Sequence, residues 1–122
     1  MTATIDPSKI EAFAALTATR AASAWTIASI HIGDRLGLYA ALAEGPGTAE
    51  RIATRAACNP RLTREWLNGQ VASEIVELDG DAYRLPAEHA AVLAVDDSPA
   101  FLGGLGGVLA AVFQGESRIL DA

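Results

Sequence analysis

The sequence predicts a mainly α fold: a winged helix-turn-helix with a two-stranded β wing, preceded by a long N-terminal helix and followed by a glycine-rich C-terminal helix. The central segment, Thr48–Leu85, has the pattern of a short amphipathic helix, a tight turn and a second helix, then two short strands around Asp79-Gly80-Asp81. That order is typical of a winged helix-turn-helix. An alanine-rich segment precedes it and a glycine-rich segment follows it. The 122 residues, of which 51% are hydrophobic, suffice for the core of one domain.

The chain is expected to begin with a disordered tail over residues 1–7, with Pro7 and Ser8 at the beginning of the long helix. Proline is tolerated at an early helical position because its missing N–H would have no helical partner there. Good helix formers and alanines then continue the helix to about Leu36.

The long helix is more apolar than a surface helix of a small domain should be. Beyond Arg20 its polar face nearly disappears, because Ile32 and its apolar neighbours point in several directions. A helix that is apolar nearly all round must be buried nearly all round. We therefore expect a second copy of the chain, or a neighbouring domain, to cover it. The candidates for a dimer interface or a pocket lining are Phe13, Leu16, Trp25, Ile27 and Ile30.

Glycines and capping residues mark the next boundaries. Gly33 and Gly37 predict a break after the long helix, followed by a short helix over Leu38–Ala43. A loop should occupy Glu44–Gly47. Thr48 is expected to cap the first helix of the helix-turn-helix pair. The predicted buried face of this helix consists of Ile52, Ala53 and Ala56.

The second helix of the pair should begin at Asn59 and Pro60, with asparagine as the cap and proline at the first position. The wing follows as two strands, Ile75–Leu78 and Ala82–Leu85, around an Asp-Gly turn. The predicted core stripe of the second helix consists of Leu62, Trp66, Leu67 and Val71.

The last part of the chain should contain a helical stretch over Pro86–Val95 and a final helix over Ala100–Leu120, with Ser98 as its cap. Four glycines would destabilise a free helix at about 1 kcal/mol each, so another element should pack closely against them. A nucleotide-binding loop is not favoured, because no buried strand precedes these glycines. The chain reaches Ala122 without a capping signal, which suggests truncation. The four glycines are Gly103, Gly104, Gly106 and Gly107.

The charge pattern argues against a DNA-binding role. The net charge is −6, and the single lysine lies outside the helix-turn-helix, whereas binding to a phosphate backbone requires clustered basic residues. Arg61 and Arg64 begin the second helix and are the DNA-contact candidates if the domain binds DNA after all. We prefer to interpret them as surface arginines, with Arg61 and Glu65 spaced as a local ion pair. The predicted wing carries the acids Glu77, Asp79 and Asp81.

No pattern of residues in this chain predicts a catalytic, cofactor-binding or metal site. Cys58 has no second cysteine to pair with and is expected to be a partly buried apolar residue in a reducing cytoplasm. His31 and His89 lack a second ligand at helical spacing, so a hydrogen-bonded structural role is favoured. No signal peptide is apparent, and the apolar segment Ala21–Gly33 is too short to cross a bilayer. We expect a cytoplasmic protein without membrane contact.

Three segments together resemble the N-terminal winged-helix domain of bacterial class I S-adenosylmethionine-dependent methyltransferases. They are IGDRLGLYAALAEGPGTAERIA (Ile32–Ala53), REWLNGQ (Arg64–Gln70) and YRLPAEHAAVLAVDDSPAFLGG (Tyr83–Gly104). The resemblance covers nearly the whole chain from about Ser8. One departure is Glu74, which stands where the family pattern usually has a glycine, so the end of the second helix and the start of the wing could differ.

The resemblance implies that this chain is a homodimerisation and substrate-lid domain. Residues 8–95 would form the dimerisation domain, and residues 96–122 a helix leading to an absent Rossmann-like catalytic domain. S-adenosylmethionine is implied for the full-length family, which acts on small molecules. No residue that binds this cofactor maps onto the chain, which should be inactive alone. The alternative is a stand-alone winged-helix transcriptional regulator that binds DNA.

Overall fold

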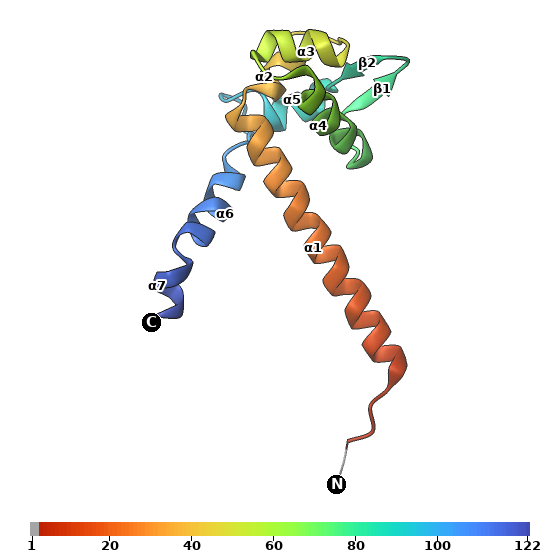
Figure 1. Cartoon of the computed structure of the whole chain (residues 1–122), viewed down its shortest axis with the longest axis vertical. Coiled ribbons are helices and arrows are strands. Elements are labelled where there is room, and N and C mark those ends of the chain that lie inside the picture. The colour runs from red at the N-terminus through yellow and green to blue at the C-terminus, as the bar shows by residue number, and fades with distance from the viewer. Residues whose placement is uncertain (1–2) are drawn as a thin grey trace.

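The computed structural model describes residues 3–122 and contains the predicted succession of helices and strands (Figure 1). A head formed by residues 38–93 carries two protruding helical segments, α1 (Pro7–Arg35) and the pair α6 (Leu105–Gln114) and α7 (Glu116–Leu120) (Figure 1). The fold is mainly helical with one two-stranded sheet, which confirms the predicted winged helix-turn-helix. The elements are α1 (Pro7–Arg35), α2 (Leu38–Ala43), α3 (Ala49–Ala56), α4 (Pro60–Ala72), β1 (Glu77–Asp79), β2 (Ala82–Arg84), α5 (Ala87–Leu93), α6 (Leu105–Gln114) and α7 (Glu116–Leu120).

Helix α1 spans 29 residues and has well-defined ends. At its start, the Asp6 carboxylate accepts hydrogen bonds from the hydroxyl (2.7 Å) and the backbone N–H (2.9 Å) of Ser8. These bonds hold the pKa of the Asp6 carboxyl below its ordinary value. At its end, Gly37 adopts the left-handed conformation (φ 71°), whereas the helix continues through Gly33. The helix begins at Pro7, as predicted, and the first two residues of the predicted tail over residues 1–7 lie outside the described part of the chain.

Helices α3 and α4 are the helix-turn-helix pair, and both begin with the predicted caps. The Thr48 hydroxyl accepts a hydrogen bond from the N–H of Arg51 (3.3 Å), and the Asn59 side chain accepts one from the N–H of Leu62 (3.1 Å). Pro60 occupies the first turn of α4, where its missing N–H leaves no bond unmade. Local chemistry therefore sets where both helices begin.

The hydrophobic core lies in the head, where α2, α3 and α4 meet the hairpin. The predicted buried face of α3 is confirmed, because Ile52 and Ala53 are fully buried. Leu62 was predicted in the core and is instead 53% exposed, because no described part of the chain covers the first turn of α4 on that side. The largest fully buried side chains are Leu38, Tyr39, Leu42, Ile52, Leu67, Gln70 and Val76.

A buried polar network fixes the C-terminal half of α1 to the head. The Gln70 amide donates to the Ser29 hydroxyl of α1 (2.9 Å), and its oxygen accepts a hydrogen bond from the Tyr39 hydroxyl. The Trp66 indole N–H donates to the Ser29 carbonyl (2.9 Å), and its ring packs edge-on against Tyr39 with centroids 5.1 Å apart. Burial, followed by the charge of Asp34, raises the pKa of the Tyr39 hydroxyl, so Tyr39 remains a neutral donor. The network sets the direction in which α1 leaves the head.

The wing is a short antiparallel hairpin in which Leu78 pairs with Tyr83. Gly80 takes the left-handed conformation (φ 62°) in its two-residue turn. The first strand begins at Glu77 and not at Ile75 as predicted. The N–H groups of Ile75 and Val76 donate instead to the Gln70 carbonyl (3.0 and 3.3 Å), which closes the end of α4.

Two residues other than glycine take the left-handed conformation at helix ends. Ala57 follows α3 with φ 54°, and Glu74 lies just beyond α4 with φ 61°. The departure at Glu74 therefore leaves the left-handed turn intact, although a Cβ atom makes that conformation costly. The wing begins after this turn.

The predicted helix over Ala100–Leu120 is wrong at its start and is not continuous. The chain from Asp96 to Gly104 forms turns, and α6 begins only at Leu105. The Leu102 N–H donates to the Val92 carbonyl (2.7 Å), which holds this segment against α5 and prevents it from entering a helix. A second break at Gly115 separates α6 from α7.

Candidate interaction surface

Two helical segments extend beyond the head and are mostly uncovered (Figure 1). We call residues 7–25 of α1 the N-terminal leg and helices α6 and α7 the C-terminal leg. Every described residue from Ala3 to Trp25 is exposed. The C-terminal leg packs against the half of α1 nearer the head, and the two legs diverge away from it (Figure 1).

Large apolar side chains on both legs face solvent. Trp25 is 78% exposed, Phe13 67% and Phe113 66%. Single exposed apolar residues are common on protein surfaces, but many large ones gathered on two protruding helical segments are typical of an interface. Further exposed members are Ile10, Leu16, Leu105, Val108, Val112, Ile119 and Leu120.

Helix α6 meets α1 at Gly106. A Cβ atom placed on this glycine would lie 2.4 Å from the Cβ of His31, so only glycine permits this approach of α6 to α1. The prediction that another element packs closely against the glycines is confirmed here. At Gly103 a Cβ would lie 2.5 Å from the ring of Phe101 in the same turn and 3.2 Å from the Asp34 carboxylate of α1. The prediction is wrong for Gly104 and Gly107, because a Cβ on either would meet nothing within 4 Å.

A groove runs between α1 and α6 on one side of the Gly106 contact. It has a volume of about 350 Å³. We call it the Trp25 groove. Its wall on α1 consists of Ala24, Trp25, Ala28, His31 and Ile32, and its wall on α6 of Gly106, Leu109, Ala110 and Phe113. None of these side chains carries a permanent charge, so the groove suits an apolar occupant.

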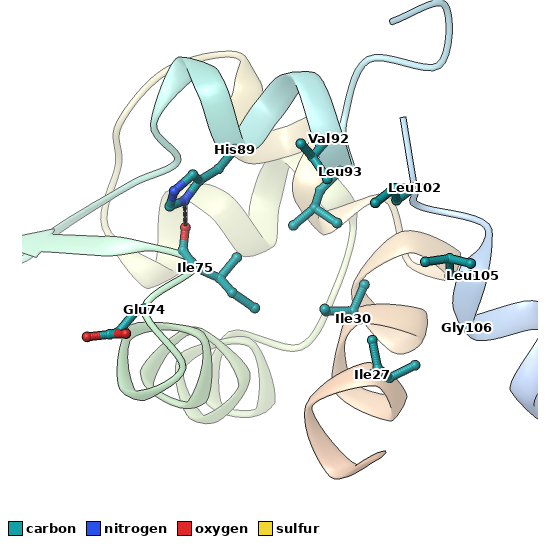
Figure 2. Close-up of a pocket in the computed structure, with 10 residues that line it drawn as sticks. All are labelled: Ile27, Ile30, Glu74, Ile75, His89, Val92, Leu93, Leu102, Leu105 and Gly106. Carbon is teal, nitrogen blue, oxygen red and sulfur yellow. Dashed lines mark hydrogen bonds between the residues drawn. The ribbon is translucent and has the colours of Figure 1, made fainter. Parts of the chain in front are cut away.

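A second cavity, of about 310 Å³, lies where α1 joins the head (Figure 2). Figure 2 shows aliphatic side chains converging on it, with Glu74 at the margin. His89 Nδ1 lies 2.7 Å from the Ile75 carbonyl oxygen. Because a carbonyl only accepts, Nδ1 carries the hydrogen, and the predicted structural role of His89 is confirmed. The aliphatic lining residues are Ile27, Ile30, Ile75, Val92, Leu93, Leu102 and Leu105.

The five predicted interface or pocket residues do not converge on one place. Trp25 lines the Trp25 groove, whereas Ile27 and Ile30 line the cavity at the head. Phe13 and Leu16 are exposed on the N-terminal leg and contribute to neither. The α6 wall of the groove was not predicted from the sequence. Its signal was the glycine at position 106, which marks where two helices approach.

The arginines considered for DNA contact are engaged in ion pairs. Arg61 pairs with Glu65 (2.7 Å), as predicted from their spacing, and Arg64 pairs with Glu50 of α3. The backbone N–H of Glu50, and then the Arg64 guanidinium, hold the pKa of the Glu50 carboxyl below its ordinary value. In the wing, Arg84 is paired with Glu77. These carboxylates would compete with phosphates for the arginines.

A family model of the Rv2258c-like winged HTH domain matches residues 12–95. The chain belongs to this family. It is 40% identical over 77 residues to the N,N-dimethyltransferase OxyT of Streptomyces rimosus, a match covering 62% of this chain and 22% of OxyT. Within residues 3–122, no helix is both long enough and apolar enough to cross a membrane.

Solved structures share the winged-helix fold. PigF, solved with SAH, superposes with a TM-score of 0.72 at 23% identity over 86% of this chain and 32% of PigF. The N,N-8-amino-8-demethyl-D-riboflavin dimethyltransferase RosA from Streptomyces davawensis gives 0.61 at 20% identity over 76% of this chain and 28% of RosA. The chain thus spans 22% to 32% of the length of these three proteins and resembles their N-terminal part.

Proposed function

We propose that this chain is the N-terminal dimerisation and substrate-lid domain of an S-adenosylmethionine-dependent methyltransferase that acts on a small molecule in the cytoplasm. The similarity to OxyT and the family membership support the methyltransferase assignment. The observation that carries the role of the domain is the pair of exposed apolar legs, which require another protein surface to cover them.

The proposal divides the protein at the end of the head. Residues 8–95 hold the dimerisation domain, and residues 96–122 lead from it toward a catalytic domain. The turns over Asp96–Gly104 support this boundary, because they separate the head from α6. Gly106 then directs α6 along α1, which would place the start of a following domain near the legs.

Catalysis would be shared between the two domains. S-adenosylmethionine supplies an electrophilic methyl group, and the catalytic domain would hold it. The residues of this chain would contribute an apolar wall that excludes water from the substrate. The cavity at the head, with Ile27 and Leu105 on its lining, is a suitable wall because most of its lining is aliphatic, with Glu74 and His89 as its polar members.

Calorimetric titration of the 122-residue chain with S-adenosylmethionine tests this division. We expect no measurable heat of binding from a sample whose circular dichroism shows folded helices, because the cofactor site would lie in the other domain. Tight binding of one cofactor molecule per chain would contradict the proposal.

A further inference from the structure

We propose that the N-terminal leg of one copy lies antiparallel along α1 of a second copy, with its Ile10 and Phe13 in the Trp25 groove of that copy. This inference rests on the proposed dimerisation function. To the proposal of a dimer, this inference adds the two surfaces that meet, the orientation of the two helices and the register of their residues.

A stripe of uncharged residues runs along α1 with the spacing of a coiled-coil seam. Its members are separated alternately by four and three residues. This repeat keeps them on one side of a helix that pairs with another helix. Most members are alanines, which allow two helix backbones to approach closely. The stripe consists of Ile10, Ala14, Thr17, Ala21, Ala24, Ala28 and His31.

The stripe is continuous with the Trp25 groove. Its last three members, Ala24, Ala28 and His31, form part of the wall of that groove on α1. The first members lie on the N-terminal leg, where every residue is exposed. A helix placed along the stripe would therefore rest on α1 and also touch the α6 wall, including the exposed ring of Phe113.

The N-terminal leg of a second copy has the properties that such a helix needs. It is a helix of this chain without a partner of its own, and it presents Ile10 and Phe13 to solvent. In a two-fold dimer the N-terminal leg of each copy fills the Trp25 groove of the other copy. The same contact therefore covers both the leg and the groove. A different partner could fill the groove but would leave the N-terminal leg exposed.

The position of the groove selects the register. In an antiparallel pair, Ala14 opposite Ala24 brings Ile10 opposite Ala28 and places the two-fold axis near Thr19. Residues Ile10 and Phe13 then both fall within the stretch of α1 that lines the groove. Phe13 lies on the side of the stripe that faces α6, and it would pack near Phe113.

Disulfide trapping tests this register in the full 122-residue chain carrying Cys58→Ser. Ala14→Cys and Ala24→Cys lie about 15 Å apart along one helix, too far for a bond within a copy. In the proposed dimer the two residues face each other across copies. We expect mild oxidation to convert this variant into a covalent dimer. The matched control is Ala15→Cys with Ala22→Cys, two alanines on the opposite side of α1, which should remain uncrosslinked.

The outcomes separate this inference from the function on which it rests. A dimer by light scattering that does not crosslink through Ala14→Cys and Ala24→Cys, or crosslinks equally through the control pair, overturns the register and leaves dimerisation standing. A monomer at every concentration overturns both.

A charge placed in the groove gives a second measurement. Phe13→Asp would bury a carboxylate among apolar side chains, so we expect the dissociation constant of the dimer to rise roughly tenfold or more. Thr19→Asp on the same exposed leg lies outside the groove and serves as the control. An unchanged dissociation constant for Phe13→Asp would contradict the seating of Phe13.

Discussion

At the scale of single residues, backbone conformation identifies two positions where the chain is less stable than it could be. Ala57 and Glu74 adopt positive φ angles of 54° and 61° at the ends of α3 and α4. A side chain with a Cβ atom is disfavoured there, whereas glycine is not. Both residues are exposed, so a substitution removes no core packing.

We expect Ala57→Gly and Glu74→Gly each to raise the free energy of unfolding by about 0.5–1 kcal/mol. Ala72→Gly replaces the last helical residue of α4 and should lower the free energy of unfolding by up to about 1 kcal/mol. Urea denaturation at one fixed protein concentration measures all three. A loss of stability in Ala57→Gly equal to that in Ala72→Gly would contradict the left-handed assignment.

The contact between α6 and α1 gives a second prediction for single residues. Gly106→Ala places a methyl group against His31, so α6 must shift, at a cost of about 1–3 kcal/mol in the free energy of unfolding. Gly107→Ala adds the same methyl group one residue later, where nothing lies within 4 Å, and should be neutral or stabilising. Thermal unfolding of the two variants compares them directly. Equal destabilisation would argue against close packing at Gly106.

At the scale of secondary structure elements, α1 is held to the head by polar contacts as well as apolar ones. Gln70 is fully buried and bonds to both Tyr39 and Ser29. We expect Gln70→Ala to cost about 2–4 kcal/mol, because it leaves a cavity and two hydroxyl groups without their partner. The variant should also weaken the attachment of α1, which hydrogen exchange at Ser29 and its neighbours would detect.

Asn68→Ala is the matched control on the same helix. Asn68 is exposed and accepts a hydrogen bond from the Tyr83 hydroxyl (2.6 Å), for which water can substitute. Its loss should cost less than about 1 kcal/mol. If both variants lose equal stability in guanidinium denaturation, the buried network does not anchor α1.

The elements that local chemistry determines could be predicted from the sequence. The caps Thr48 and Asn59, the break at Gly37 and the turn at Gly80 all follow from the conformational preferences of these residues, and the structure contains each of them. The first strand was predicted two residues too early, because the bonds of Ile75 and Val76 to Gln70 depend on how α4 ends.

The features that depend on tertiary contact could not be predicted. The late start of α6 follows from the bond between Leu102 and Val92, which no local pattern encodes. The Trp25 groove requires α6 to lie against α1, so its α6 wall could not be assigned from the periodicity of α1 alone. The apolar residues of α1 were selected from the sequence as interface or pocket candidates, whereas their division between a groove, a cavity and a free surface could not be predicted.

At the scale of the whole molecule, charge separates the proposed function from a DNA-binding one. The net charge is −6, and Arg61 and Arg64 are paired with acids. We expect fluorescence anisotropy with random duplex DNA at low salt to detect no binding that depends on these arginines. Any residual signal should be the same for the unmodified chain and for Arg61→Ala and Arg64→Ala. Salt-sensitive binding that these two variants abolish would favour the transcriptional regulator.

The central claim is that a second copy of this chain covers the apolar legs. Light scattering coupled to gel filtration measures the mass of the folded molecule most directly. We predict twice the chain mass of 12.6 kDa across a dilution series. A single species of 12.6 kDa at all concentrations, with helical circular dichroism and cooperative unfolding, would contradict the account.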